Sequence, residues 1–365
     1  MLRDSVNKHL EEMSQIPVEE YTLYRKWCEI NEKEWSAADR QRIFEIENSM
    51  WVPKEPEDYL KLEPVLYHTS DPFINKTWLI LRIFTSTMPW NINVGRIQRF
   101  VVADKVTRQY LGVISVASDF ISLGGRDKHI GWNYNQRIKN KMLNHTACGT
   151  SIVPTQPLGF SFVGGKLMAL LTACDVIENI WNEKYKELLV GITTTSLYGG
   201  YSQYNRLSYW KKCASTEGRI PLEPIDSVYK ELRQWVKDNY PSDFDRITKN
   251  TTKILSRPKN RMLNFAYAKL KIRPPENHFS RGVYWCSLYE NSEDFLAKRT
   301  AKLGERKFDN SVRSLTNLWK ERYASKRVKS LVKSGRYKTD KLFYNGMIGL
   351  SWDETKDKYL KEVGR

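Results

Sequence analysis

Two adjacent side chains, those of Arg126 and Asp127, could take part in acid–base chemistry. They stand in the stretch RDKHIGW, directly after a Gly-Gly pair. A carboxylate such as Asp127 can accept a proton in a transfer step, and a guanidinium such as Arg126 can stabilise a developing charge. Tyr204 is the candidate acid for a leaving group. The alternative is a structural ion pair, the usual arrangement of neighbouring loop charges, and the sequence leaves both interpretations open.

A loop that could bind a phosphate lies between a β-type run at residues 150–153 and an apolar helical run at residues 166–181. It reads TQPLGFSFVGG and leads straight into the helix. The N–H groups of the first helical turn are therefore expected to face an anion or a polar ligand. A tight turn before the helix is the alternative role for its Gly-Gly pair. The candidate cofactor-binding residues are Gln156, Gly159, Ser161, Gly164 and Gly165.

Aromatic side chains crowd a second Gly-Gly turn in the stretch SLYGGYSQYNRLSYW. Their rings could stack on a nucleic-acid base, or they could pack against the underside of a sheet. The candidate nucleic-acid contacts in this stretch are Tyr201, Tyr204, Asn205, Arg206 and Tyr209.

The charge of the chain is strongly positive and unevenly distributed. The formal net charge is +17 over 365 residues, which indicates a polyanionic partner, most often nucleic acid. Residues 1–60 carry 8 basic and 14 acidic side chains, whereas residues 301–365 carry 17 basic and 8 acidic ones. The C-terminal segment is therefore expected to act as a basic arm. The candidate phosphate contacts are Arg137, Lys139, Lys326, Arg327, Lys329, Lys333 and Arg336.

Hydrophobic patterning predicts an α/β fold, with a mixed twisted sheet flanked by helices. Strands are expected at residues 76–87, in IQRFVVAD, at 110–116, 150–153 and 188–195, and in RGVYWCSLY. The segment SVYKELRQWVKDNYP is expected to be a helix that Pro241 ends. Ser36 and Asp39 form a capping-box pattern at the start of an N-terminal helix. We expect an acidic helical prefix at residues 1–60, the α/β core at 61–300 and a basic helical extension at 301–365.

Several classes of protein are disfavoured. Five cysteines and five histidines are scattered without a C-x-x-C or H-x-x-x-H pair, so neither a disulfide framework nor a metal site is expected. The sequence contains no uninterrupted apolar run of about 18 residues, and no secretion signal, so we expect a cytoplasmic protein without a membrane span.

The central stretch resembles the Druantia defence-system protein A family. YLGVISVASD, RDKHIGW, a helix carrying Arg137, LNH and IVP follow the order of that family's core motifs. Downstream, YSQYNRLSYWKK resembles the family's Tyr-x-Ala-Ala-Asn-Trp block, and SRGVYWCSLY resembles its late Arg-Gly-Val-Tyr strand. The resemblance covers about residues 89–296. At the acidic position that the family has before the block, this chain has Thr194 or Thr195.

The same region is similar, at the level of the fold, to Mom-type phage DNA-modification proteins of the acetyltransferase-like superfamily. That resemblance implies an acetyltransferase-like core, with acetyl-CoA or another acyl or carboxymethyl donor at the glycine-containing loop. It also implies group transfer to a DNA base, as protection of a phage against restriction. The glycines do not reproduce the Arg-x-x-Gly-x-Gly spacing of the superfamily.

The alternative is a non-catalytic DNA-binding subunit of a Druantia-type defence or recombination machine. DNA is the expected partner in both cases, in the host cytoplasm if a phage encodes the protein. The N-terminal helices are candidates for contacts with protein partners.

Overall fold

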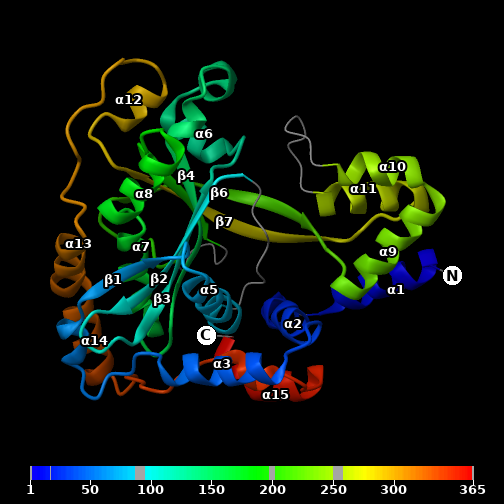
Figure 1. The fold of residues 1–365 in the computed structure, drawn as a ribbon, viewed down its shortest axis with the longest axis horizontal. Helices are drawn as coiled ribbons and strands as arrows, with labels where there is room; N and C mark the ends of the chain where they lie inside the picture. The colour runs from blue at the N-terminus through cyan, green and yellow to red at the C-terminus, as the bar shows by residue number, and fades with distance from the viewer. Residues whose placement is uncertain (1, 17, 87–94, 197–201, 250–257, 364–365) are drawn as a thin grey trace.

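A seven-stranded sheet forms the centre of the protein in a computed structural model that describes residues 2–16, 18–86, 95–196, 202–249 and 258–363 (Figure 1). The strand order is β1-β2-β3-β4-β5-β7-β6, and only β4 and β5 pair in parallel among the described strands. The strands are β1 Pro64–His68, β2 Ile97–Asp104, β3 Tyr110–Ser118, β4 Thr146–Pro154, β5 Gly191–Ser196, β6 Trp210–Pro221 and β7 Glu276–Ser287. The predicted fold class, a mixed sheet flanked by helices, is confirmed.

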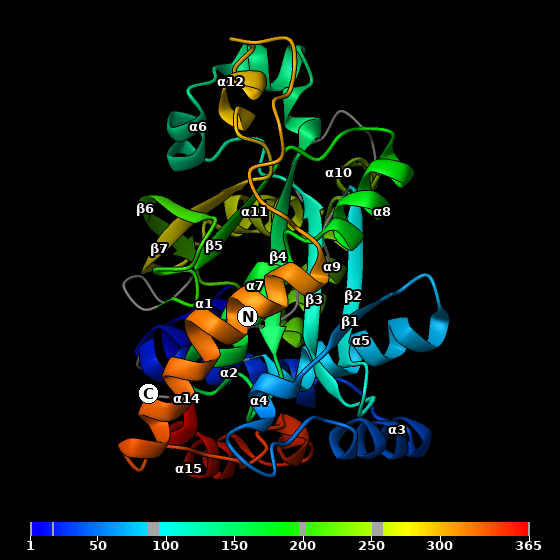
Figure 2. The ribbon, with the colours of Figure 1, turned by 90° about the vertical axis from the view of Figure 1, so that its left-hand side faces the viewer.

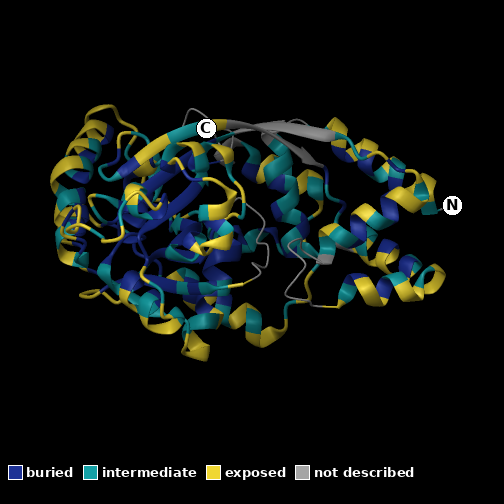
Figure 3. Cartoon of the chain, turned by 90° about the horizontal axis from the view of Figure 1, so that it is seen from above, coloured by how far each residue is buried: buried dark blue, intermediate teal, exposed yellow. Residues whose placement is uncertain are grey.

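Helices cover both faces of the sheet, which explains why its central strands β3 and β4 are buried along most of their length. Side chains alternate between the faces: Phe100 and Val102 pack in one hydrophobic cluster, and Val101 packs in the other. The first face is covered by α7 Val163–Leu171, α8 Asp175–Tyr185, α13 Val312–Trp319 and α14 Ser325–Lys333. On the second face α5 Pro72–Thr85 packs on the strands, and α2 Val18–Asn31, α3 Ala37–Asn48 and α15 Trp352–Val363 contribute to the same hydrophobic cluster. Figure 3 shows the buried positions gathered in the interior of the protein, with exposed positions on its outer surface.

The strand expected at residues 76–87 is wrong, because residues 76–85 belong to helix α5; residue 87 lies outside the described residues. Asp71 caps the helix by accepting hydrogen bonds from the N–H groups of Phe73 (2.7 Å) and Ile74 (3.4 Å). Pro72 occupies the first turn, where its missing N–H costs nothing. The helix is buried on most sides, so its sequence has no clear helical period. A short apolar run of this kind cannot be assigned from periodicity alone.

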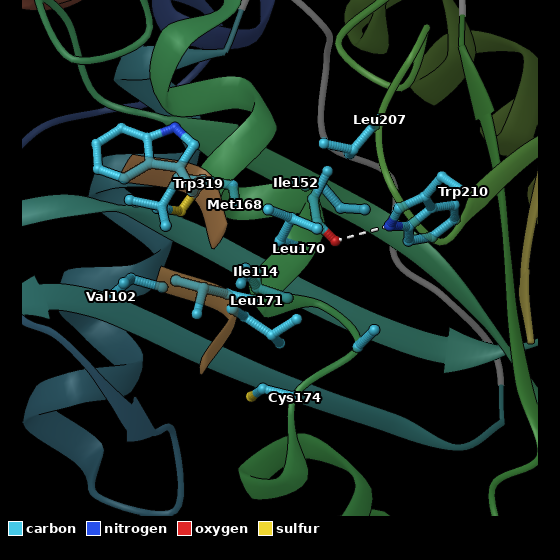
Figure 4. Close-up of a cluster of buried hydrophobic side chains, with 14 of the residues drawn as sticks. Val102, Ile114, Ile152, Met168, Leu170, Leu171, Cys174, Leu207, Trp210 and Trp319 are labelled. Atoms are coloured by element: carbon cyan, nitrogen blue, oxygen red, sulfur yellow. Dashed lines mark hydrogen bonds between the residues drawn. The ribbon is translucent and has the colours of Figure 1, made fainter. Parts of the chain in front are cut away.

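The apolar run at residues 166–181 is helical as predicted, but it forms two helices, α7 and α8. The break follows Leu171, and the N–H of Asp175 at the start of α8 donates to the carbonyl of Asn310 at 2.9 Å. Residues Phe160–Tyr185 are long and apolar enough to cross a membrane, yet 67% of the most apolar part is buried inside the protein. Figure 4 shows α7 within the core, where Trp210 donates a 3.0 Å hydrogen bond to the carbonyl of Ala169. The run is a core element of this fold.

The N-terminal segment is helical, and it packs within the protein. Ser36 and Asp39 form the predicted capping box at the start of α3. Val6, Leu10 and Met13 of α1 Leu2–Gln15 are buried against the helices between β6 and β7. These helices are α9 Asp226–Asn239, α10 Pro241–Thr248 and α11 Pro258–Leu270, so Pro241 ends one helix as predicted and begins the next. Contacts of the N-terminal helices with protein partners remain a prediction.

Helices α13 and α14 of the C-terminal segment cross the face of the sheet that carries α7 (Figure 2). A π-helical turn at Lys320–Ala324 joins α13 to α14. Trp319 is fully buried and donates a 2.8 Å hydrogen bond to the carbonyl of Val163, the first residue of α7. The arm is thereby fixed to the start of α7. Three short helices complete the fold: α4 Asp58–Lys61, α6 Gly124–Ile130 and α12 Ser292–Leu296.

Candidate nucleic-acid interface

Arg126 lies on α6 and is completely buried in a network of charged side chains. Its Nη1 atom is 2.7 Å from the Oδ1 atom of Asp119, at the end of β3. Its Nη2 atom is 2.6 Å from the Oδ1 atom of Asp127 and donates a 2.8 Å hydrogen bond to the carbonyl of Phe120. Burial disfavours the charged form, but the two carboxylates outweigh it, and the pKa of Arg126 is raised. Arg126 is therefore held as a buried cation.

The carboxylate of Asp127 accepts hydrogen bonds on both oxygens. Oδ1 accepts from Nε and Nη2 of Arg126 and from Nε1 of Trp132 at 2.9 Å. Oδ2 accepts from the backbone N–H of Leu123 at 3.0 Å and from Nη1 of Arg137 at 2.8 Å. Proton transfer to Asp127 would disrupt several of these bonds. The geometry thus fits the structural ion pair better than the acid–base role.

The predicted phosphate contacts Arg137 and Lys139 differ in their surroundings. Arg137 is buried, and its guanidinium is bound to Asp127. Lys139 is exposed. Asp119 was not among the sequence candidates. It closes the network by accepting a 2.9 Å hydrogen bond from Thr193 of β5. The signal that could have found Asp119 in the sequence was its position directly after a predicted strand, in VASD.

The parallel strands β4 and β5 separate after a short pairing. Residues 146–149 pair with residues 191–194, and beyond them the strands diverge. Gln203 lies at this separation and donates hydrogen bonds to the carbonyl of Ile152 and to the hydroxyl of Tyr204, both at 3.1 Å. Tyr204 is buried against the rings of Trp210 and Tyr284. Burial raises the pKa of Tyr204 to about 12, which opposes its loss of a proton.

The glycines before α7 are sites of close packing. A Cβ atom on Gly164 would lie 2.5 Å from the side chain of Leu158 and 2.8 Å from its carbonyl oxygen. The N–H of Gly164 already donates to that carbonyl at 2.8 Å. A Cβ atom on Gly165 would overlap the side chain of Gln203. Both glycines lie in the first turn of α7 and pack closely there, whereas the alternative expected from the sequence was a tight turn before the helix.

The remaining candidates in this loop lie closer to the surface. Gln156, Gly159 and Ser161 are half-buried. The N–H of Gly159 donates to the carbonyl of Thr155 at 2.8 Å, and the Ser161 hydroxyl accepts a hydrogen bond from Arg327 of α14. Binding of a phosphate by this loop remains a prediction.

Lys166, which the sequence did not single out, holds the aromatic segment on α7. Its Nζ atom donates to the carbonyls of Gln203 (3.1 Å) and Asn205 (2.7 Å). Burial and the nearby charge of Arg206 lower the pKa of Lys166 to about 8. Arg206 itself is exposed.

The aromatic candidates are largely engaged inside the protein. The hydroxyl of Tyr284 donates a 2.7 Å hydrogen bond to the side chain of Asn205. Tyr209 stacks on Phe308 with ring centroids 3.8 Å apart and planes 9° apart, so one face of its ring is covered. Tyr201 lies outside the described residues.

A row of basic side chains follows the solvent-facing side of the C-terminal arm. We define the basic stripe as Arg322, Lys326, Lys329 and Lys333, which are all exposed. Their spacing of four, three and four residues places them on one side of the helix. Ala324, Val328 and Leu331 face the core on the opposite side.

The charge around the basic stripe is unbalanced. Residues 322–339 include seven basic and no acidic residues. In the described part of the chain, none of the four stripe residues forms an ion pair. Of the other predicted arm contacts, Arg327 is bound to Ser161, and Arg336 donates to the hydroxyl of Ser334 at 3.2 Å.

Comparison with known proteins identifies the family. The sequence profile of Druantia protein DruA matches residues 60–298, more than half of the chain. The chain belongs to the Druantia protein DruA family. It is 28% identical over 195 residues to the Druantia protein DruA of Escherichia coli (strain UMEA 4076-1). This alignment covers 49% of the chain and 48% of the relative, so the chain spans about half the length of the curated relative it matches.

The match to the DruA family covers the whole sheet and the Arg126 network, whereas the basic stripe lies beyond it in sequence. No solved structure matches the chain.

Proposed function

We propose that this DruA-family protein is a DNA-binding component of a Druantia-type defence system, and that the basic stripe is its main contact with DNA. The observation that carries this proposal is four exposed cations on one side of a helix whose other side is anchored in the core. Since none of the four forms an ion pair with the described residues, their charges are available to bind phosphates.

The dimensions of the stripe suit a nucleic-acid backbone. From Arg322 to Lys333 the chain takes 11 steps of about 1.5 Å each, a rise of about 16 Å along the helix axis. One strand of B-DNA has a phosphate about every 3.4 Å along the axis, so this length spans about five phosphates. Lysine and arginine side chains that neutralise these phosphates release counterions, which drives binding without any reading of base sequence.

The state of the predicted catalytic residues supports a non-catalytic role. Asp127 is saturated with hydrogen bonds, Arg126 is completely buried, and the high pKa of Tyr204 disfavours proton release. A reaction at these groups would require the network around α6 to open.

The proposal is tested by removing three charges of the stripe. The variant Lys326→Gln/Lys329→Gln/Lys333→Gln should bind a DNA duplex about 100-fold more weakly than the wild type at 0.15 M salt, measured by fluorescence anisotropy. The matched control neutralises Lys8, Lys237 and Lys302, which lie away from α14, and should change affinity only slightly. Equal weakening in both variants would show that total charge, rather than the stripe, determines binding.

Group transfer to a DNA base is the second candidate function. The observation that favours it is the succession of β4, a glycine-containing loop, helices α7 and α8, and the parallel strand β5, which is similar to the strand–loop–helix–strand order of an acetyltransferase-like core. Mass spectrometry of nucleosides from host DNA after expression of the protein tests this function. A new nucleoside that disappears in the variants Arg126→Ala, Asp127→Ala and Tyr204→Phe would favour transfer over simple binding.

A further inference from the structure

Phe162 presents an aromatic ring to solvent at the start of α7. It is the residue before the first turn of the helix, and 42% of its surface is exposed. Its backbone is left-handed, with φ of 65°, and so is that of Ser161, with φ of 54°. A bulky side chain rarely adopts this conformation.

Several contacts hold the backbone in this conformation. The N–H of Phe162 donates to the carbonyl of Gly159 at 3.1 Å, and the hydroxyl of Ser161 is bound by Arg327. On the helix side, Trp319 is hydrogen-bonded to the carbonyl of Val163. The fold thus keeps an apolar ring in water on a strained segment. Strain of this kind is concentrated at functional sites, because elsewhere it only reduces stability.

Cationic side chains lie close to the segment that carries this ring. Arg327 contacts the neighbouring Ser161, and the Nζ atom of Lys338 lies 5.6 Å from the ring centre of Phe160. Lys166 is one helical turn after Phe162 on α7. Arg327 and Lys338 belong to the same segment as the basic stripe. A ligand on Phe162 would therefore also be within the region where DNA phosphates are proposed to bind.

We propose that Phe162 is a stacking platform for an unpaired base, and that the preferred ligand of this surface is single-stranded DNA. This inference rests on the proposed DNA-binding function and deepens it. Non-specific single-strand sites combine cationic side chains for the backbone with exposed aromatic rings for the bases. In a duplex the base faces are stacked on one another and cannot reach such a ring.

The burial of the tyrosine rings explains why we assign base stacking to Phe162 and not to Tyr204 or Tyr209. The ring of Tyr204 is buried, and Phe308 covers one face of the Tyr209 ring. Phe162, by contrast, is exposed, and the neighbouring Ser161 is bound by Arg327.

The test compares a labelled 20-nucleotide single strand with the duplex of the same sequence by fluorescence anisotropy. The wild type should bind the single strand more tightly. The Phe162→Ala variant should bind it about tenfold more weakly, with less than a twofold change for the duplex, because loss of one stacked base typically has an effect of this size. Phe162→Trp should retain the affinity. The control Phe44→Ala removes a ring that is 57% exposed on α3 and should leave binding unchanged.

A second measurement identifies the contact directly. A single strand containing 5-iodouracil, irradiated in complex with the protein, should cross-link to the peptide that contains Phe162. Cross-linking only to other peptides would overturn the inference.

The outcomes separate the two proposals. Absence of binding to either form of DNA would overturn the proposed function and the inference together. If the stripe variant is weakened but Phe162→Ala binds the single strand like the wild type, only the stacking inference fails. Equal loss of single-strand and duplex binding in Phe162→Ala would also overturn it.

Discussion

Replacement of Arg126 by methionine tests whether the Arg126 network supports the fold or performs a reaction. Methionine is similar in length and apolar, so it removes the charge and the hydrogen bonds while filling much of the space. Arg126 joins Asp119 of the β3 end to Asp127 of α6, and its guanidinium lies over the ring of Trp132, 5.3 Å from the ring centre. The substitution therefore leaves two carboxylates without their shared cation.

The expected loss is about 3 kcal/mol. Removing one partner of a buried ion pair typically costs about 3 to 5 kcal/mol, because the remaining charge stays buried without compensation. The lower value applies here, since Asp127 keeps the hydrogen bond from Arg137 and Asp119 keeps that from Thr193. For a chain of 365 residues this corresponds to a decrease of about 4 °C in the thermal midpoint.

Thermal unfolding followed by circular dichroism provides the measurement, with Arg246→Met as the matched control. Arg246 pairs with Asp243 at 2.5 Å, but its side chain is 71% exposed, so its loss should cost less than about 1 kcal/mol. Arg126→Met should bind DNA like the wild type at temperatures well below its midpoint. A midpoint within about 1 °C of the wild type, or weaker DNA binding at unchanged stability, would refute a purely structural role.

Three further predictions follow from particular contacts. Phe162→Gly should be about 1 kcal/mol more stable than Phe162→Ala in chemical denaturation, since both lose the ring and only alanine keeps the strain of the left-handed backbone; equal stabilities would contradict that strain. Gly164→Ala should cost about 1 to 3 kcal/mol because its Cβ would meet the backbone of Leu158, whereas Gly124→Ala, with open space around its Cβ, should be tolerated. Burial opposes ionisation of Glu293, but the imidazole of His129, 3.4 Å away, and a hydrogen bond from Ser287 lower its pKa to about 2. Ionised Glu293 therefore stabilises the folded state above the usual carboxyl pKa range, and this stabilisation is lost as the pH falls toward 2. The thermal midpoint of Glu293→Gln should fall less steeply between pH 4.5 and 2 than that of the control variant Glu183→Gln, whose site is exposed.

The order of the central elements could be predicted from local patterns. Apolar runs of strand length bounded by turn residues indicated β3, β4 and β5, and the capping pair Ser36 and Asp39 indicated the start of α3. Helix α5 could not be assigned in this way, because burial on most of its sides removes the periodicity. Its start was nevertheless encoded in Asp71 and Pro72, a capping residue followed by proline.

The candidate site was less predictable because it depends on contacts between distant segments. The sequence grouped Arg126 with Asp127, but it could not show that Asp119 completes the pair from the end of a strand. Burial likewise decides between a stacking ring and a packing ring, and it separates Tyr204 from Phe162 only in the folded chain. The composition indicated a basic C-terminal arm. Which side of the arm is exposed could be known only from the packing of its helix against the core.

The salt dependence of DNA affinity tests the central claim most directly. Anisotropy titrations of the wild type and of the Lys326→Gln/Lys329→Gln/Lys333→Gln variant over about 50 to 200 mM salt give the slope of log K against log salt concentration for each. We predict a steep negative slope for the wild type and a slope smaller by about 3 on duplex DNA, or about 2 on a single strand, for the variant. Identical slopes for the two proteins, or no binding at the lowest salt concentration, would contradict the assignment of the basic stripe as the DNA contact.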